Sequence, residues 1–428
     1  MLLLIALATN FRLSQAANTI SLTYNIDRSD IPALNDNELT LIFNTANASE
    51  IEIIDVTNGP IPFESGPAAD EVTVTTTSSQ LTVTLTNPAA DEQMGEFRKA
   101  GLKDNYPWAY SHGFDDNYFL EQETAVFLDR GIPAGFNLVT RWIIDPASPW
   151  EGDFQASELN TLIAAGWAIN NHATDHENSC HTIYDRVSRK ADVLLAQEDL
   201  RTLIAASPKP DLLVLGYTVP CGGTAQFNDY PGIIREIRDG QEDTLLYTDG
   251  IYQPPFNVDV SPPYDLDAII KRDSRIDGSG GSAAILIAEF DKTSQLANES
   301  GNPHWYTTFS HGSHLFGSNV AALETMLDYL IDSYGSNGTD EVWIAPTTVV
   351  YSYLLVRDKS IVTLVNPPAE TTTPSPTSTN TVTATPTLIS SQTPTPFATA
   401  TNEPFPLHTS TPIGSNRTPV LFLPLNLK

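Results

Sequence analysis

Apolar and polar positions follow different patterns in different parts of this chain. Between about residues 104 and 358, apolar residues recur at helical spacing, as from Leu323 to Ile331, where they form one helix face. Residues 120–128 and 182–206 are predicted to form further helices, and short apolar runs between the helices predict strands. These runs cover residues 134–139, 167–169, 212–216, 244–247, 284–288, 305–309 and 342–345. Strands that alternate with helices over this length predict a parallel sheet, either closed as a barrel or open.

The remaining segments have other patterns. Residues 19–88 are rich in Thr, Val and Ile with partial alternation, and Asn, Gly and Pro interrupt them, which predicts short strands of a small β-rich region. Residues 252–302 contain two Pro pairs and a glycine run, so we expect loops around one strand there. After about residue 367, Thr, Pro and Ser dominate. Such a segment cannot bury enough apolar surface to fold, which predicts a disordered linker or stalk.

These changes of pattern predict how the chain is organised. The apolar start, followed by the small residues Ser14 and Ala16, predicts a signal peptide over residues 1–16. The predicted order is then a β-rich region at 17–95, an α/β domain at 96–360, a Thr/Pro/Ser-rich linker at 361–412 and a short apolar tail at 413–428. We therefore expect a secreted or cell-surface protein whose tail associates with the cell wall. No apolar run approaches the ~20 residues that a membrane-spanning helix needs.

Composition narrows the class of partner. A formal net charge of -30 argues against binding to nucleic acid or to anionic lipid, and a neutral or cationic partner fits better. The acidity is also explained by solubility alone. Cys180 and Cys221 are the only cysteines, and they form either one disulfide in an exported protein or two buried thiols.

Candidate chemistry lies just after three of the predicted strands. The acidic pair Asp115 and Asp116, the histidines His172 and His176, and His311 each follow an apolar run. Strand ends of this kind meet on the face where barrel enzymes assemble their active sites. Two imidazoles four residues apart, with a carboxylate nearby, are suitable zinc ligands. Two adjacent carboxylates disfavour each other's ionisation unless one binds a cation or the two have different roles.

The spacing of these residues resembles that of a known family. Phe114-Asp115-Asp116 resembles the first motif of the polysaccharide deacetylases, which are the NodB-homology group or carbohydrate esterase family 4. The stretch His172-Ala173-Thr174-Asp175-His176 resembles their second motif, His-Ser/Thr-x-x-His, and Phe309-Ser310-His311 resembles the late Leu-x-His motif. The order of the motifs agrees over most of the stretch from Phe114 to Tyr351.

This resemblance implies a fold and a reaction. The implied fold is α/β, a distorted (β/α) barrel of NodB type, and the implied reaction is metal-dependent removal of N- or O-linked acetyl groups from a polysaccharide. Asp116, His172 and His176 would hold a divalent metal, most often zinc. Asp115 would be the general base and His311 the general acid. Candidate substrates are peptidoglycan, chitin-type polymers and acetylated xylan.

The chain departs from the family at the third motif, which usually reads Arg-Pro-Pro-Tyr-Gly. Here Thr218-Val219-Pro220-Cys221-Gly222 stands in its place, so the arginine that orients the base is missing. Arg141 and His112 are candidate replacements, the backbone at Cys221 remains a candidate oxyanion donor, and Trp305 is a candidate platform for a sugar ring. The alternative reading is a catalytically weak glycan-binding module that keeps the deacetylase fold.

Overall fold

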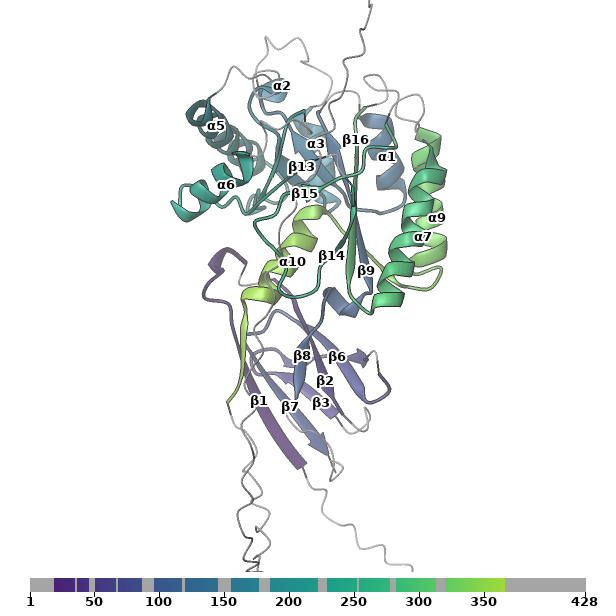
Figure 1. Cartoon of the computed structure of the whole chain (residues 1–428). Coiled ribbons are helices and arrows are strands. Elements are labelled where there is room, and N and C mark those ends of the chain that lie inside the picture. The colour runs from purple at the N-terminus through teal and green to yellow at the C-terminus, as the bar shows by residue number, and fades with distance from the viewer. Residues whose placement is uncertain are drawn as a thin grey trace, which may run out of the picture. The chain divides into compact units, whose positions relative to one another are not determined.

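The computed structural model describes residues 19–34, 37–45, 51–66, 68–86, 96–117, 120–144, 155–176, 185–221, 229–251, 254–277, 282–312 and 320–365 (Figure 1). Three predictions fall outside these residues: the signal peptide at 1–16, nearly all of the Thr/Pro/Ser-rich linker, and the apolar tail at 413–428. They stay predictions.

The centre of the α/β part is a curled sheet of parallel strands. In spatial order these are β16 (His304–Ser310), β9 (Trp108–Asp115), β10 (Gly135–Leu138), β11 (Ala168–Asn171), β12 (Gly216–Thr218), β13 (Tyr247–Ile251) and β15 (Ile270–Lys271). An isolated parallel bridge between Asp273 and Thr308 joins the chain after β15 to β16, so the two ends of the sheet meet. The prediction of a distorted (β/α) barrel is confirmed.

Two further strands extend this sheet. The strand β14 (Asn257–Asp259) pairs antiparallel with β16, and β17 (Val342–Ile344) pairs parallel with the first residues of β9. The strand β9 therefore has neighbours along its whole length, which agrees with its eight buried residues. A strand buried on both faces reads as a nearly continuous apolar run, and the first residues of β9 do so.

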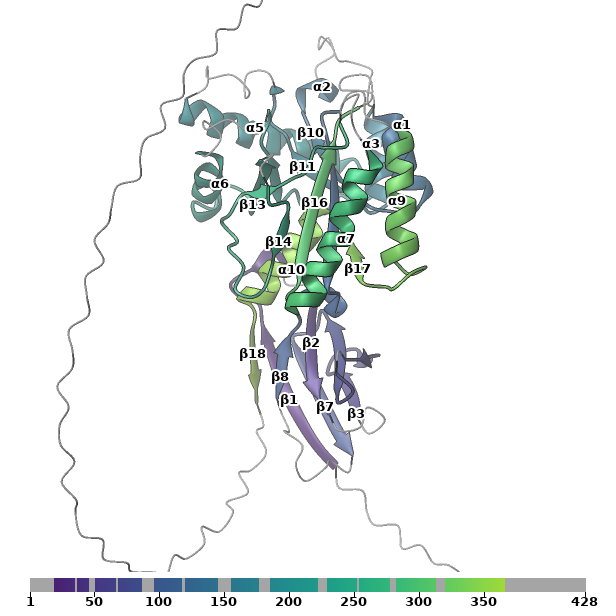
Figure 2. The same ribbon diagram turned by 45° about the vertical axis from the view of Figure 1, so that its right-hand side comes forward.

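Eight helices of the described residues accompany the sheet (Figures 1 and 2). They are α1 (Glu121–Asp129), α2 (Arg141–Ile144), α3 (Ala156–Ala164), α5 (Arg186–Ala205), α6 (Tyr230–Asp239), α7 (Ala283–Ser300), α9 (Val320–Tyr334) and α10 (Thr347–Lys359). The helices predicted near 120–128, 182–206 and 323–331 correspond to α1, α5 and α9. Helices α7 and α9 lie side by side in both views.

The prediction of a strand at 284–288, with loops around it, was wrong. These residues form the first turns of α7, whose start is capped by the Ser282 side chain accepting a hydrogen bond from the Ala284 amide. The buried residues Leu286, Phe290 and Ala297 recur at helical spacing well beyond the apolar run. The five-residue run was too short to reveal this period. Gly301 ends the helix in the left-handed conformation.

The β-rich region forms two antiparallel sheets. One contains, in spatial order, β18 (Ile361–Leu364), β1 (Thr19–Asp27), β7 (Gln80–Thr86), β3 (Ile51–Asp55) and β4 (Gly59–Pro60). The other contains β5 (Glu64–Ser65), β6 (Glu71–Thr76), β2 (Leu39–Asn44) and β8 (Phe97–Lys99). Strands β8 and β18 lie beyond the predicted boundary at residue 95, and β18 occupies the start of the predicted linker. The region is therefore completed by chain from both sides of the barrel.

The β-rich region and the barrel share contacts and a core. Residues of both belong to one cluster of buried apolar side chains, which includes Leu41 of β2 and Leu354 of α10. The Tyr353 hydroxyl donates to the Ala100 carbonyl at 3.1 Å, and the Lys99 ammonium donates to the Arg357 carbonyl at 2.6 Å. Within the described part of the chain, no helix has the length and apolar character to cross a membrane.

Candidate active site

The two adjacent carboxylates have separate environments. Asp115 is the last residue of β9, and its side chain lies inside the curled sheet with 1% of its surface exposed. Asp116 follows with a φ of 63°, in the left-handed region that costs a residue other than glycine about 1 kcal/mol or more. The two side chains have different nearest partners, Arg272 for Asp115 and the histidines His172 and His176 for Asp116.

Asp116 meets two histidines. Its Oδ1 lies 3.4 Å from Nε2 of His172 and 3.4 Å from Nε2 of His176, and among the described residues this buried oxygen has no hydrogen-bond partner. A buried carboxylate oxygen without a partner is costly, and a bound cation would compensate it. Ligand atoms about 3.4 Å apart are also what a tetrahedral metal with bonds of ~2.1 Å requires. These three residues therefore fit a metal ion such as zinc.

The two histidines are oriented by a carbonyl group of β12 and by the turn after β11. Nδ1 of His172 lies 2.9 Å from the Thr218 carbonyl, so the Nδ1 hydrogen is donated there and Nε2 keeps its lone pair. Ala173 is buried with a φ of 72°, and its amide donates to the Asn171 side chain at 2.9 Å. This turn brings His176 back beside His172, with ring centroids 5.1 Å apart.

Asp115 has a buried arginine partner, and it is Arg272. The guanidinium donates from Nη1 to Oδ1 and from Nη2 to Oδ2, both at 2.7 Å. It also lies 4.4 Å from the centroid of the Phe309 ring. A side chain at Gly113 would place its Cβ 3.1 Å from Nη1, so glycine leaves the room that the arginine occupies. The arginine missing from the third motif is thus replaced from the chain after β15.

Three charged groups, Asp115, Arg272 and Asp249, lie together inside the curled sheet. Burial alone would raise the pKa of Asp115, but the Arg272 guanidinium holds that pKa well below its usual range. A second carboxyl, Asp249, lies with Oδ1 3.6 Å from Nε of Arg272. Burial raises the pKa of Asp249; the Arg272 guanidinium opposes this and the nearby Asp115 adds to it, and the net pKa is raised. Asp115 is therefore the carboxylate that stays ionised beside the arginine.

A row of buried amides supports Asp115 from the neighbouring strands. Asn137 donates to Oδ1 of Asp115 at 2.5 Å, and Asn170 donates to Asn137 at 2.9 Å. These residues stand opposite each other on β9, β10 and β11. Thr348 of α10 donates to the Asn170 carbonyl oxygen at 2.8 Å and completes the row. Contacts with the described residues then occupy three of the four acceptor positions of the Asp115 carboxylate and leave one on Oδ2.

His311 lies on the other side of Asp116. Its Nε2 is 4.0 Å from Oδ2 of Asp116, and its Nδ1 is 2.7 Å from Oδ2 of Asp277. The His311 amide also donates to Oδ1 of Asp277 at 3.1 Å. Burial lowers the pKa of His311, but the hydrogen bond to Asp277 and the nearby charges of Asp115, Asp277 and Asp116 together outweigh burial, and the net pKa is raised. The surroundings of His311 thus favour its protonated form beside Asp116.

The two candidate replacements for the missing arginine have other partners. Arg141 forms an ion pair with Asp175, with Nη1 2.8 Å from Oδ2. His112 is buried, and its Nδ1 and Nε2 lie 2.7 Å and 3.0 Å from the hydroxyls of Thr308 and Ser310. Burial, followed by the charge of the nearby guanidinium, lowers the pKa of His112 to about 3. Neither residue is the partner of Asp115, and both predictions were wrong.

Two further predicted site residues, Trp305 as a platform for a sugar ring and Cys221 as an oxyanion donor, have other surroundings. Trp305 is 2% exposed near the start of β16, six residues before His311, and its Nε1 donates to the Ser111 hydroxyl at 3.0 Å. Cys221 follows β12 with a φ of 53° and is disulfide-bonded. Its predicted partner, Cys180, lies outside the described residues, so the pairing and the oxyanion role stay predictions.

Sequence reasoning missed Arg272, Asp277 and Asn137. Arg272 follows the apolar pair Ile269-Ile270, which is the same strand-then-polar pattern that identified the other site residues. The signal was weak because β15 has only two residues and lies in a segment rich in Pro and Gly. Asn137 stood inside an apolar run and was counted as part of a strand.

Comparisons with known proteins complete the description. No protein-family model matches the chain, and no curated protein matches it. Among solved structures, it is similar to the allantoinase PuuE, with 12% identity, a TM-score of 0.41, and coverage of 58% of this chain and 90% of that one. It is similar to a protein from Mycobacterium smegmatis described as a polysaccharide deacetylase, with 13% identity, a TM-score of 0.40, and coverage of 62% and 96%. It is also similar to BA3943 from Bacillus anthracis, a CE4 family pseudoenzyme, with 13% identity, a TM-score of 0.36, and coverage of 57% and 66%.

Proposed function

We propose that this chain is a secreted or cell-surface hydrolase that removes N- or O-linked acetyl groups from a polysaccharide with the help of a divalent metal, most often zinc in this class of site. The proposal is supported by the convergence of Asp116, His172 and His176 at a buried, unpartnered carboxylate oxygen. It is supported equally by the two residues that flank this cluster, Asp115 and His311.

The metal ligands would be Asp116 Oδ1 and the Nε2 atoms of His172 and His176. When bound, such an ion polarises a carbonyl group and lowers the pKa of water, and three protein ligands leave positions open for both. The remaining steps belong to the protein side chains. The Nδ1 hydrogen bond from His172 to the Thr218 carbonyl keeps the imidazole in the tautomer that this role needs.

Two proton transfers complete acetyl hydrolysis. The unoccupied acceptor position on Oδ2 of Asp115 takes a proton from the water that attacks the acetyl carbon. His311 then donates the proton on Nε2 to the departing amine nitrogen or alkoxide oxygen, while Asp277 holds Nδ1 and stabilises the imidazolium. Acetate and a deacetylated sugar result; Asp115 releases its proton to solvent and His311 takes one up, so both groups return to their starting states.

The single observation that carries the proposal is the two-point pairing of Asp115 with buried Arg272. Loss of the third-motif arginine was the feature that favoured a catalytically weak glycan-binding module. Arg272, from the chain after β15, pairs with Asp115 instead, which favours the enzyme over the binding module.

Acetate release tests the proposal. The full chain, loaded with zinc, is incubated with acetylated chitin-type oligomers, peptidoglycan and acetylated xylan, and free acetate is measured. We expect release from at least one of these, and loss of release in the Asp115→Asn and His311→Ala variants. Bound metal without acetate from any of the three would instead support the glycan-binding module.

A further inference from the structure

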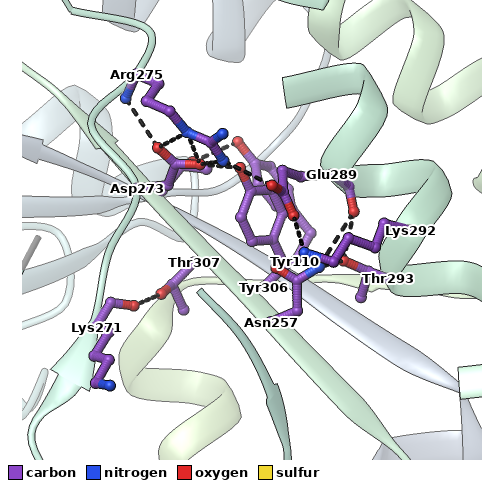
Figure 3. A network of polar contacts seen from close by, with 11 residues as sticks. Tyr110, Asn257, Lys271, Asp273, Arg275, Glu289, Lys292, Thr293, Tyr306 and Thr307 are labelled. Atoms are coloured by element: carbon purple, nitrogen blue, oxygen red, sulfur yellow. Dashed lines mark hydrogen bonds and ion pairs between the residues drawn. The ribbon is translucent and has the colours of Figure 1, made fainter. Parts of the chain in front are cut away.

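The residues that hold Asp115 and His311 come from one short segment. Arg272 and Asp277 lie five positions apart, directly after β15, and each binds one of the two groups proposed to move protons. The chain between them is held by a second set of charged residues, drawn in Figure 3. The positions of acid and base therefore depend on how firmly residues 272–277 are fixed.

Asp273 fixes this segment to β16. Its amide donates to the Thr307 carbonyl at 2.9 Å, and its carbonyl accepts from the Phe309 amide at 3.0 Å. Its Oδ2 accepts a hydrogen bond from the Tyr306 hydroxyl at 2.8 Å. Asp273 has no exposed surface, so its charge needs compensation inside the protein.

Arg275 supplies that compensation and connects the segment to α7. Its Nε lies 2.9 Å from each carboxylate oxygen of Asp273, and its Nη2 lies 3.0 Å from Oε1 of Glu289 (Figure 3). Its guanidinium carbon is 5.4 Å from the centroid of the Phe256 ring. The Lys292 ammonium lies 3.3 Å from the other oxygen of Glu289. One guanidinium thus links the segment after β15 to a helix.

We propose that Asp273, Arg275 and Glu289, here called the anchor, are positioning residues for the base and the acid at once. This inference rests on the proposed function and adds residues outside the metal cluster. A shift of the segment would displace Arg272 from Asp115 and Asp277 from His311 together. Proton transfer needs heavy atoms within ~2.6–3.2 Å, so a small displacement lowers the rate of the chemical step.

The anchor predicts a specific kinetic signature. The metal ligands come from the chain after β9 and β11, and Arg275 contacts neither segment in the described residues. Loosening the anchor should therefore lower kcat while KM and bound metal stay constant. Substitutions of groups that support catalytic side chains typically cost about 10–100-fold in activity.

The test uses the full, zinc-loaded chain with the substrate that releases most acetate. Three variants are compared: Arg275→Gln, Arg275→Lys and Glu289→Gln. Readouts are kcat, KM, zinc content and hydrogen–deuterium exchange of the peptide that covers residues 270–277. We expect Arg275→Gln to lower kcat by about 10–100-fold, with KM and zinc unchanged and faster exchange in that peptide. Arg275→Lys should restore part of kcat, and Glu289→Gln, which keeps the Asp273 pair, should show a smaller change in the same direction.

The matched control is Arg130→Gln. It removes another arginine–aspartate ion pair, in which Arg130 Nε lies 2.7 Å from Oδ1 of Asp328 between α1 and α9. This variant should keep both kcat and the exchange rate of residues 270–277.

Several outcomes would overturn the inference. Faster exchange in residues 270–277 with unchanged kcat would do so, as would a kcat loss equal to that of Arg130→Gln. If Arg275→Gln fails to fold, an unchanged kcat in Glu289→Gln overturns it. An unaltered chain that releases no acetate overturns the proposed function instead, so the two failures are distinguishable.

Discussion

Arg272 and Asp115 are 157 positions apart in the chain and meet in a two-point ion pair, with both N···O distances at 2.7 Å. Each side chain has 1% of its surface exposed. A buried ion pair is retained only when hydrogen bonds satisfy both partners, and Asn137 supplies one of them to the carboxylate. Because the guanidinium holds both carboxylate oxygens, it fixes the orientation of Asp115 as well as its charge.

Substitutions of Arg272 should separate its role in orienting Asp115 from its role in compensating the charge of Asp115. Arg272→Lys keeps a cation but loses the planar fork, so we expect kcat to fall by about 10–100-fold while the protein still folds. Arg272→Met leaves Asp115 buried without compensation and should lower the free energy of unfolding by about 3–5 kcal/mol. Acetate release and urea unfolding measure the two effects. Wild-type kcat in Arg272→Lys would contradict the positioning role.

Gly113 should be intolerant of a side chain. In Gly113→Ala the new Cβ would lie 3.1 Å from both Nη1 of Arg272 and Nδ2 of Asn137, so one of these groups must move. We expect kcat to fall by about tenfold, because Asp115 loses its fixed position while the metal ligands are untouched. Gly232→Ala is the control, since its Cβ would meet only ordinary contacts at 3.4 Å and beyond. Equal kcat in the two variants would show that the space around Gly113 is unimportant.

The amino-acid sequence predicts much of this site, because most of its residues lie in short continuous motifs. Asp115, Asp116, His172 and His176 lie in contiguous motifs that follow apolar runs, so both their types and their placement are visible. The confirmed helices likewise have an apolar period long enough to detect. Asp116, His172 and His176, the three residues predicted to hold a metal, lie together in the structure.

What sequence reasoning missed depends on distant contacts. Arg272 follows a strand of only two residues, and nothing near it in sequence reveals that it approaches Asp115 inside the curled sheet. The first turns of α7 were misread because Ala284 to Ala288 is apolar throughout and shows no period by itself. In both cases tertiary contacts decide what the local pattern leaves open.

The pH dependence of activity should report on His311. Burial lowers the pKa of this imidazole, but the Asp277 hydrogen bond and the charges of the nearby carboxylates together more than reverse that effect, so its pKa lies above the ordinary value of 6.5. An acid must be protonated to act, so activity is present below this pKa and is lost as the pH rises through it. In Asp277→Asn only burial and the weaker charges remain, and the alkaline limb of kcat/KM should move to lower pH. An alkaline limb that stays in place would exclude His311 as the acid.

Metal binding should stabilise the fold through the three ligands. Zinc at 100 times its Kd adds about 2.7 kcal/mol to the free energy of unfolding of the unaltered chain. His172→Ala and His176→Ala should lose this gain and most of the bound zinc, since each removes one of three ligands. His304→Ala is the control, because His304 is buried at the start of β16 and bonds the Asn302 carbonyl at 2.9 Å. Full zinc content in both ligand variants would refute the site.

The central claim is that the adjacent carboxylates have two different roles. The most direct measurement is acetate release by Asp115→Asn at full zinc occupancy, with Asp116→Asn measured in parallel. We predict that Asp115→Asn binds zinc as the unaltered chain does but releases acetate at least about 100-fold more slowly, because it cannot accept the proton. Asp116→Asn should lose zinc and activity together. Acetate release at the unaltered rate by zinc-loaded Asp115→Asn would contradict the account.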